Sequence, residues 1–150
     1  MGSIPDLNAS KSANHVHWHV LIIHFPISFF VAAFGFQILH LFTKPECFED
    51  ATNVALLAGT VVLIPTTWSG WRTWKTRYHG AHVLIFQRKV IIAFIMQGLS
   101  LVLAVWRVGF AAAFENDHTS MAHWVYLVGN TLLMIGASAE GYYGGRLNHR

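Results

Sequence analysis

Histidines are the residues of this chain with the clearest potential for chemistry. The 150 residues include ten histidines but only seven aspartates and glutamates. Most of the histidines gather where two apolar stretches begin, at His15, His17, His19, His24, His79 and His82. Histidine is costly in lipid unless it faces the interior of a bundle or binds a ligand. This clustering therefore indicates a ligand-binding site.

The spacing of these histidines suits haem ligation. His15 and His19 are four residues apart, and His79 and His82 are three apart, so each pair shares a helix face. Cofactor sites in bundles take ligands from facing helices, and two neutral imidazoles give a six-coordinate, electron-transferring iron. We expect His24 and His82 to be the axial ligands of one haem b, with His19 and His79 as substitutes. Propionates of such a haem would be neutralised by basic side chains, namely Arg72, Arg88, Lys89 and Arg146.

Simpler roles compete with this interpretation. His15 and His17 lie outside the apolar stretch and are expected to be solvated. His24 precedes Pro26, which leaves a backbone carbonyl without its partner, and His24 can satisfy that carbonyl instead of a metal. A second, outer haem on His40 and His123 is less favoured. At 100° and 1.5 Å per residue, His24 and His40 point about 160° apart and lie roughly 24 Å apart along a helix.

The elements that must position these residues follow from composition. Apolar residues make up 54% of the chain and charged residues 11%, against roughly 25% charged in a soluble domain. The single cysteine, Cys47, excludes an internal disulfide and the Cys-x-x-Cys-His attachment of covalent haem. The chain therefore has the composition of a membrane protein, and its basic charge does not argue for nucleic acid binding.

Apolar runs divide the chain into four predicted helices, at about 18–42, 51–74, 79–107 and 118–141. Each is long enough for the roughly 20 residues that a span needs, and none alternates as barrel strands do. Lys44-Pro45-Glu46 is predicted to end the first helix. We expect an all-α integral membrane protein, with a polar tail at 1–14 and a single four-transmembrane-helix bundle at 15–150.

Loop charges give this bundle an orientation. The N-terminus, the second loop and the C-terminus hold most of the basic residues, at Lys11, Arg72, Lys75, Arg77, Arg88, Lys89, Arg146 and Arg150. The other side holds mainly acids, at Glu46, Glu49, Asp50, Glu115 and Asp117. The positive-inside rule then places both termini in the cytoplasm, with the bacterial inner membrane as the expected location.

Other polar and small residues carry structural expectations. Glu140 is expected to be a solvated carboxylate at the membrane interface. Gln37 and Gln97 are expected to form hydrogen bonds between helices, and the segment 129–136, with a glycine at each end, fits close helix packing. Gly-Tyr-Tyr-Gly-Gly at 141–145 suggests close backbone approach or a tight turn.

The stretch His19-Val-Leu-Ile-Ile-His24-Phe-Pro-Ile27 resembles the opening motif of a bacterial membrane family, domain of unknown function 2231. Further counterparts are Ser69-Gly70-Trp71, His82 and Gly144-Gly145-Arg146-Leu147. The resemblance covers about residues 15–149 and implies four membrane helices, with histidines placed as in small b-type cytochromes. Position 20 departs from the family motif, with valine in place of proline.

The leading hypothesis is a membrane electron-transfer subunit. Its haem would pass electrons between the quinone pool and a partner oxidoreductase subunit, and the protein would supply ligands and a low-dielectric site. The first alternative is a cofactor-free structural anchor or assembly subunit of a larger membrane complex. A third hypothesis is metal handling by the histidines at 15–24. We expect a redox or non-catalytic subunit, because short loops leave little surface for a soluble substrate.

Overall fold

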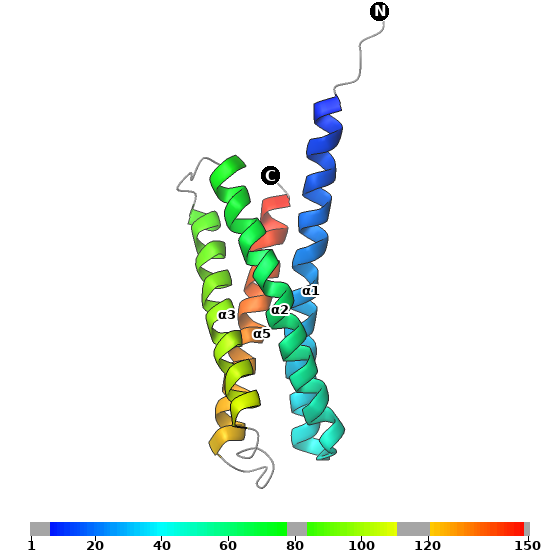
Figure 1. Cartoon of the computed structure of the whole chain (residues 1–150), viewed down its shortest axis with the longest axis vertical. Helices are drawn as coiled ribbons and strands as arrows, with labels where there is room; N and C mark the ends of the chain where they lie inside the picture. Colours follow the sequence, from blue (N-terminus) through cyan, green and yellow to red (C-terminus); the bar gives the residue numbers. More distant parts are fainter. Residues whose placement is uncertain (1–6, 78–83, 111–120, 149–150) are drawn as a thin grey trace, which may run out of the picture.

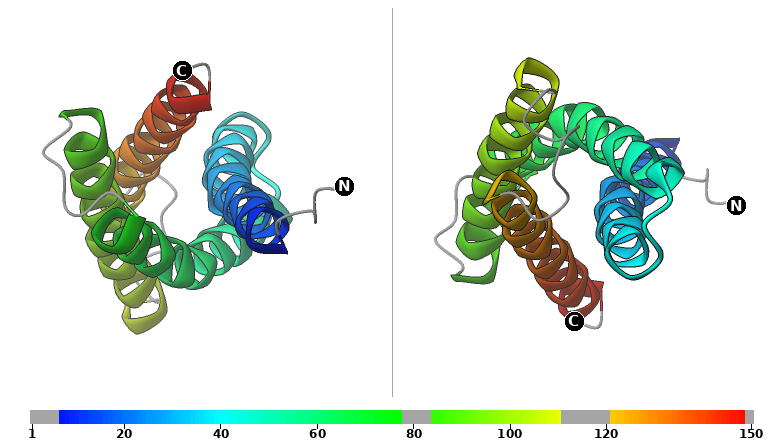
Figure 2. Two further views of the ribbon diagram at one scale, coloured as in Figure 1. Left: turned by 90° about the horizontal axis from the view of Figure 1, so that it is seen from above. Right: turned by 90° about the horizontal axis from the view of Figure 1, so that it is seen from below.

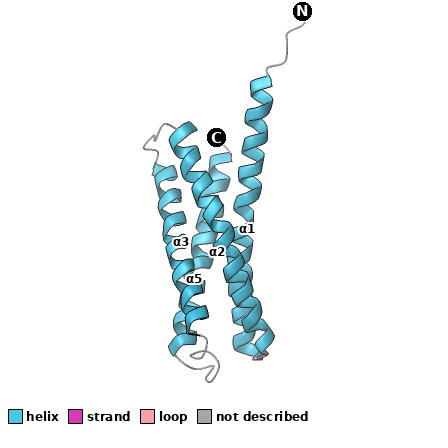
Figure 3. Ribbon diagram, in the orientation of Figure 1, coloured by secondary structure: helices cyan, strands magenta, loops and turns pink. Residues whose placement is uncertain are grey.

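A computed structural model of the protein describes residues 7–77, 84–110 and 121–148. These residues form four helices, α1 (Leu7–Thr43), α2 (Glu46–Arg77), α3 (Leu84–Gly109) and α5 (Met121–Asn148). Within these ranges the chain contains no strand (Figure 3). The all-α prediction is confirmed.

The helices run up and down in one bundle (Figure 1). α1 packs against α2, α2 against α3, α3 against α5, and α5 against α1, which closes a ring. α1 and α3 therefore occupy opposite corners, as the end-on views show (Figure 2). We call the end with Leu7, Arg77, Leu84 and Asn148 the tail end, and the end with Thr43, Glu46, Gly109 and Met121 the hairpin end.

The outer surface of the bundle is apolar. Valine and isoleucine side chains are exposed along α2 and α3, at Val54, Val61, Ile64, Ile95, Val102 and Val105. Three segments are long and apolar enough to cross a membrane, at Ile22–Thr43, Glu46–Thr76 and Gln87–Gly109. α5 is not among them, and it carries the polar His123 and Asn130. The chain is a membrane protein with three candidate spans.

Several boundaries differ from the predicted ones. α1 begins at Leu7, inside the predicted tail, and α2 begins at Glu46, before the predicted 51. The predicted start of the third helix near His79 lies outside the described residues. The predicted turn at 141–145 is wrong, because α5 continues to Asn148. Glycine costs a helix only about 1 kcal/mol relative to alanine, and edge contact between Tyr142 and Tyr143 accompanies this segment.

The connection between α1 and α2 confirms its prediction. The N–H of Lys44 donates to the carbonyl of His40 at 2.8 Å, and Lys44 has a φ of 62°. A residue with this left-handed backbone conformation commonly ends a helix. Pro45 follows Lys44. The N–H of Phe48 then donates to the Pro45 carbonyl at 3.2 Å as α2 begins. Only Lys44 and Pro45 separate the two helices.

The middle of the bundle is a close-packed apolar core that includes Phe30, Leu56, Met96, Leu103 and Leu133. Glycines lie where neighbouring side chains approach. A Cβ added to Gly129 would lie 2.7 Å from Leu103, and one on Gly136 would lie 2.8 Å from the Met96 sulfur. The prediction of close packing at 129–136 is confirmed.

Candidate functional site

Each of the four helices contributes one ionisable residue to a cluster at the hairpin end. His40 lies in the last turn of α1 and Glu49 in the first turn of α2. Arg107 lies in the last turn of α3, and His123 is the third residue of α5. We call these four residues the Glu49 cluster, because the other three side chains meet around its carboxylate.

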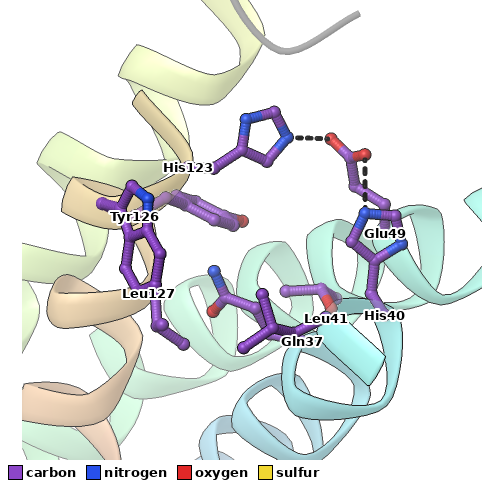
Figure 4. A pocket seen from close by; sticks show the side chains of 9 residues that line it. Gln37, His40, Leu41, Glu49, His123, Tyr126 and Leu127 are labelled. Atoms are coloured by element: carbon purple, nitrogen blue, oxygen red, sulfur yellow. Dashed lines mark ion pairs between the residues drawn. The ribbon is translucent and has the colours of Figure 1, made fainter. Parts of the chain in front are cut away.

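Glu49 forms a mostly buried ion pair with Arg107. Figure 4 shows the imidazoles of His40 and His123 on either side of Glu49. Arg107 Nη2 donates to Glu49 Oε1 at 2.7 Å. His40 Nε2 lies 3.6 Å from Glu49 Oε2, and His123 Nε2 lies 3.8 Å from Oε1. All four side chains are between 9% and 15% exposed. Hydrogen bonds between ionised groups are about twice as strong as neutral ones, so the bond between Arg107 and Glu49 is the strongest contact of the cluster.

The turn that ends α1 also orients His40. Its Nδ1 lies 3.0 Å from the carbonyl oxygen of Pro45. Because a carbonyl can only accept a hydrogen bond, Nδ1 carries the hydrogen, and Nε2 faces Glu49.

The interior stays polar for a further turn beneath the cluster. The hydroxyl of Tyr126 donates to Asn53 Oδ1 at 2.8 Å, and Asn130 Nδ2 donates to the Tyr126 carbonyl at 3.2 Å. Gln37 Oε1 and Asn130 Oδ1 are buried and have no hydrogen-bond partner among the described residues. Buried polar atoms are normally satisfied by protein or water, so these two oxygens are exceptions among the described residues.

A pocket opens beside the cluster (Figure 4). It is lined by Gln37, His40, Leu41, Glu49, Thr52, His123, Trp124, Tyr126 and Leu127. Leu41 of α1 and Trp124 of α5 are about half exposed. These two side chains belong to α1 and α5, which are neighbouring helices of the ring.

At the tail end, the histidine favoured by the sequence does not face the core. His24 is exposed, whereas Pro26, Phe30 and Ala33 of the same helix are buried. His40 is also buried, and His24 points about 160° away from it around the helix. Position 19 lies about three turns before Phe30 and within about 20° of it.

The remaining predicted haem residues are only partly described. His79 and His82 lie outside the described residues. Arg72 and Arg88 are exposed near the tail end of α2 and α3, and Arg146 belongs to the end of α5. The predicted pair of His24 and His82 stays a prediction.

Glu140 differs from its prediction as a solvated carboxylate. Its Oε2 lies 3.6 Å from Lys89 Nζ, and the side chains of Glu140 and Lys89 are 13% and 16% exposed. The ion pair joins α5 to α3 inside the bundle. The prediction was wrong because the sequence does not show which α3 residue meets α5 at this depth.

Metal ligation finds no support in the described part of the chain. No group of three or more histidine, cysteine, aspartate or glutamate residues there could hold a metal ion. In the Glu49 cluster the carboxylate is already bound to Arg107. The side chains of His15, His17 and His19 are not described, so metal handling by 15–24 stays a hypothesis.

Fold and composition together define a helical membrane protein with a polar site at one end. The family model described as "Predicted membrane protein (DUF2231)" matches residues 16–150. The chain belongs to this family, as the motif at His19–Ile27 indicated. No curated protein and no solved structure matches the chain.

Sequence reasoning missed the centre of the Glu49 cluster. It noted His40 and His123 as candidates for a second haem, but it treated Glu49 only as a loop charge and gave Arg107 no role. A signal was nevertheless present, because an ionisable residue stands near the end of every apolar run on this side of the predicted membrane. Residues at one end of an up-and-down bundle must lie close together.

Proposed function

We propose that this protein is an electron-transfer subunit of an oxidoreductase complex in the bacterial inner membrane. It would exchange electrons between the quinone pool and a partner subunit. The proposal combines a four-span bundle, both termini in the cytoplasm and one haem b at the tail end. The fourth span and the orientation are argued from exposed residues, and the haem from the position of α1.

The fourth span is supported by the outward face of α5. Val125, Val128, Leu132 and Ile135 are exposed on it, and an apolar face of this kind suits lipid. The helix has 28 residues, or about 42 Å at 1.5 Å per residue, which exceeds the roughly 30 Å of hydrocarbon. The orientation is supported by the exposed Arg72, Lys75 and Arg88 near the tail end.

The haem proposal rests on one observation, the place of position 19. Counted along α1 at 1.5 Å per residue, position 19 lies about 16 Å from Phe30, which puts it level with the start of α3. A Cβ on Gly59 would lie 2.9 Å from Phe30, which fixes the level of α1 against α2. Tyr126–Asn53 relates α2 to α5, and Lys89–Glu140 relates α5 to α3.

Because His24 is exposed, we take His19, the substitute ligand on α1, in its place. His82 or His79 would supply the second imidazole. Arg72 and Arg88 would pair with the propionates, together with Arg146. The haem would supply one-electron chemistry, and the chain would hold it and exclude water.

The test is a reduced-minus-oxidised visible spectrum of the purified protein after haem-supplemented expression, with pyridine haemochrome quantification. One low-spin haem b per chain is expected. His19→Ala and His82→Ala should each abolish the low-spin spectrum, whereas His24→Ala and His40→Ala should retain it. A folded, colourless wild-type protein would overturn the proposal.

A cofactor-free anchor or assembly subunit is the second candidate. It is favoured by the close packing of the core, where Phe30, Leu56 and Leu133 are 1% exposed or less. The exposed apolar faces on several helices also suit packing against other membrane subunits. Under this function His19→Ala and His82→Ala would change no spectrum, and loss of the protein would instead reduce the amount of an assembled complex.

A further inference from the structure

Tryptophan and basic side chains share one side of α2 at its tail end. We call Trp68, Trp71, Arg72 and Lys75 the α2 strip, because the last three follow Trp68 by three, four and seven residues and so lie on the same side of the helix. Trp68, Arg72 and Lys75 are exposed, and Trp71 is half-buried. The strip belongs to the last turns of the candidate span Glu46–Thr76. Tryptophan at the end of a span is typical of the membrane interface.

Contacts within the α2 strip fix the position of one charge. The rings of Trp68 and Trp71 lie 5.4 Å apart between their centroids. Lys75 Nζ lies 4.3 Å from the centroid of the Trp71 ring, a distance at which an ammonium group is attracted to the face of an indole. The Lys75 side chain therefore reaches back along α2. Its charge is held beside Trp71, about one turn beyond Trp68.

The two cations of the α2 strip have no acidic partner in the part of the chain that the structure describes. The acids described there are Glu46, Glu49 and Asp50 at the hairpin end, together with Glu140. Glu140 is paired with Lys89 at 3.6 Å. Asp50 lies about 37 Å from Lys75 along α2, at 1.5 Å per residue. No described carboxylate therefore neutralises Lys75 or Arg72.

Toward the middle of the bundle the same side of α2 is apolar. Leu57, Val61 and Ile64 are 41%, 64% and 51% exposed, and Leu57, Ile64 and Trp68 lie within about 40° of one another around the helix. From Leu57 to Trp68 the helix rises about 16 Å, or about half of the roughly 30 Å of hydrocarbon. A lipid chain along these residues would place its phosphate near Lys75.

We infer that the α2 strip binds the head group of an anionic phospholipid, with an acyl chain along Leu57 and Ile64. Lys75 and Arg72 would pair with the phosphate, because basic side chains beside a membrane helix attract anionic lipids. A choline head group would bring a further positive charge to two cations, which disfavours phosphatidylcholine. The inference needs only a membrane-spanning α2 and does not rest on the haem. Arg72 is also a candidate for a haem propionate, so the test is made on Lys75.

The test is native mass spectrometry of the full chain in detergent, expressed without added haem. The probes are dioleoyl phosphatidylglycerol and dioleoyl phosphatidylcholine in equal amounts. Wild-type protein should prefer the first phosphatidylglycerol by about 25-fold in Kd, since each basic residue near an anionic head group contributes about fivefold. Lys75→Gln should lower the preference to about fivefold, and Lys75→Arg should keep it.

Lys44→Gln is the matched control. Lys44 is also an exposed lysine, but it lies at the hairpin end. Its substitution lowers the net charge by the same amount and should leave the lipid preference unchanged. Circular dichroism melting checks that all three variants fold.

Four outcomes would overturn the inference. The first is equal binding of the two lipids by wild-type protein, which would favour an acidic segment of a partner protein as the occupant of the α2 strip. The second is an unchanged preference in a folded Lys75→Gln variant. The third is an equal loss in the Lys44→Gln variant, because net charge would then explain the preference. The fourth is displacement of the lipid by an equal concentration of glycerol 3-phosphate, because the strip would then bind phosphate without the lipid.

Discussion

Glu49 shows how much can depend on one side chain in a membrane bundle. Its carboxylate and the Arg107 guanidinium are each about 15% exposed or less, so little water remains to solvate either one. Removal of one partner from a buried ion pair leaves the other charge uncompensated, at a cost of about 3–5 kcal/mol. Because separation of the two charges is costly, the ion pair holds the start of α2 against the end of α3.

Glu49→Gln should lower the free energy of unfolding by about 3 kcal/mol, because Arg107 stays buried without its counter-charge. Denaturant titration in detergent micelles measures this. Glu46→Gln is the matched control: Glu46 is in the same turn of α2 but exposed, and its loss should change stability by less than about 0.5 kcal/mol. Equal effects of the two substitutions would show that the Glu49 cluster is solvated.

Gly59 presents a packing constraint at the same scale. A Cβ there would lie 2.9 Å from Phe30 Cε1 and 3.1 Å from Phe29 Cβ, and Phe30 is 1% exposed. Gly59→Ala should therefore lower the Tm by several degrees, since overpacking costs about 1–3 kcal/mol. Gly35→Ala is the control, because nothing lies within 4 Å of its added Cβ and alanine favours the helix. A lower Tm for the Gly35 variant alone would contradict this account.

Single residues also show where sequence reasoning stops. The positions of histidines and carboxylates near the ends of apolar runs were evident, and so was the angle between His24 and His40. Contacts between helices were not, because Glu49 and Arg107 are 58 residues apart and no local spacing relates them. Rotation of each helix about its own axis decides which ionisable residues meet, and packing of the whole bundle sets that rotation.

At the scale of elements, hydrophobic runs identified every described helix but not its ends. The second helix was predicted to begin at about residue 51, where its apolar run begins, yet α2 begins at Glu46. Glu46 and Glu49 lie in its first turn, where acidic side chains stabilise the positive end of the helix dipole. A charged residue next to an apolar run therefore marks where the apolar segment ends. It does not mark where the helix ends.

The two-residue connection between α1 and α2 carries backbone strain. Lys44 has a φ of 62°, a conformation that costs a residue with a Cβ roughly 1 kcal/mol and costs glycine almost nothing. Lys44→Gly should raise the free energy of unfolding by up to about 1 kcal/mol. Lys44→Ala removes the same charge but keeps the Cβ, so it should bring no such gain. Denaturant titration of both variants separates strain from charge.

For the whole molecule, composition and charge predicted a helical membrane bundle, and the structure adds the order of the ring. α1 and α3 lie at opposite corners, so a ligand held by both must cross the interior. Phe30, Leu56 and Leu133 fill the middle of that interior. Space for a haem between α1 and α3 is therefore expected only toward the tail end, beyond the core. The sequence could not show this, because four-helix topologies with the same helices differ in which pairs are diagonal.

The proposed topology has a direct test in the single cysteine. Cys47 is exposed in the first turn of α2 at the hairpin end, and four spans with cytoplasmic termini place it outside. A membrane-impermeant maleimide should therefore label Cys47 in right-side-out vesicles and not in inverted ones. In a Cys47→Ser background, Arg72→Cys near the tail end should show the opposite pattern.

The same background decides whether α5 crosses the membrane. Met121 and Tyr142 are both exposed near opposite ends of α5, and about 31 Å of helix separates them at 1.5 Å per residue. Met121→Cys should label from outside and Tyr142→Cys from inside, because the apolar outward face of α5 suits lipid along that length. Labelling of both positions from one side would leave α5 uncrossed and would reduce the bundle to three spans. The termini would then lie on opposite sides of the membrane or α5 would lie along its surface, and the charge asymmetry would need another explanation.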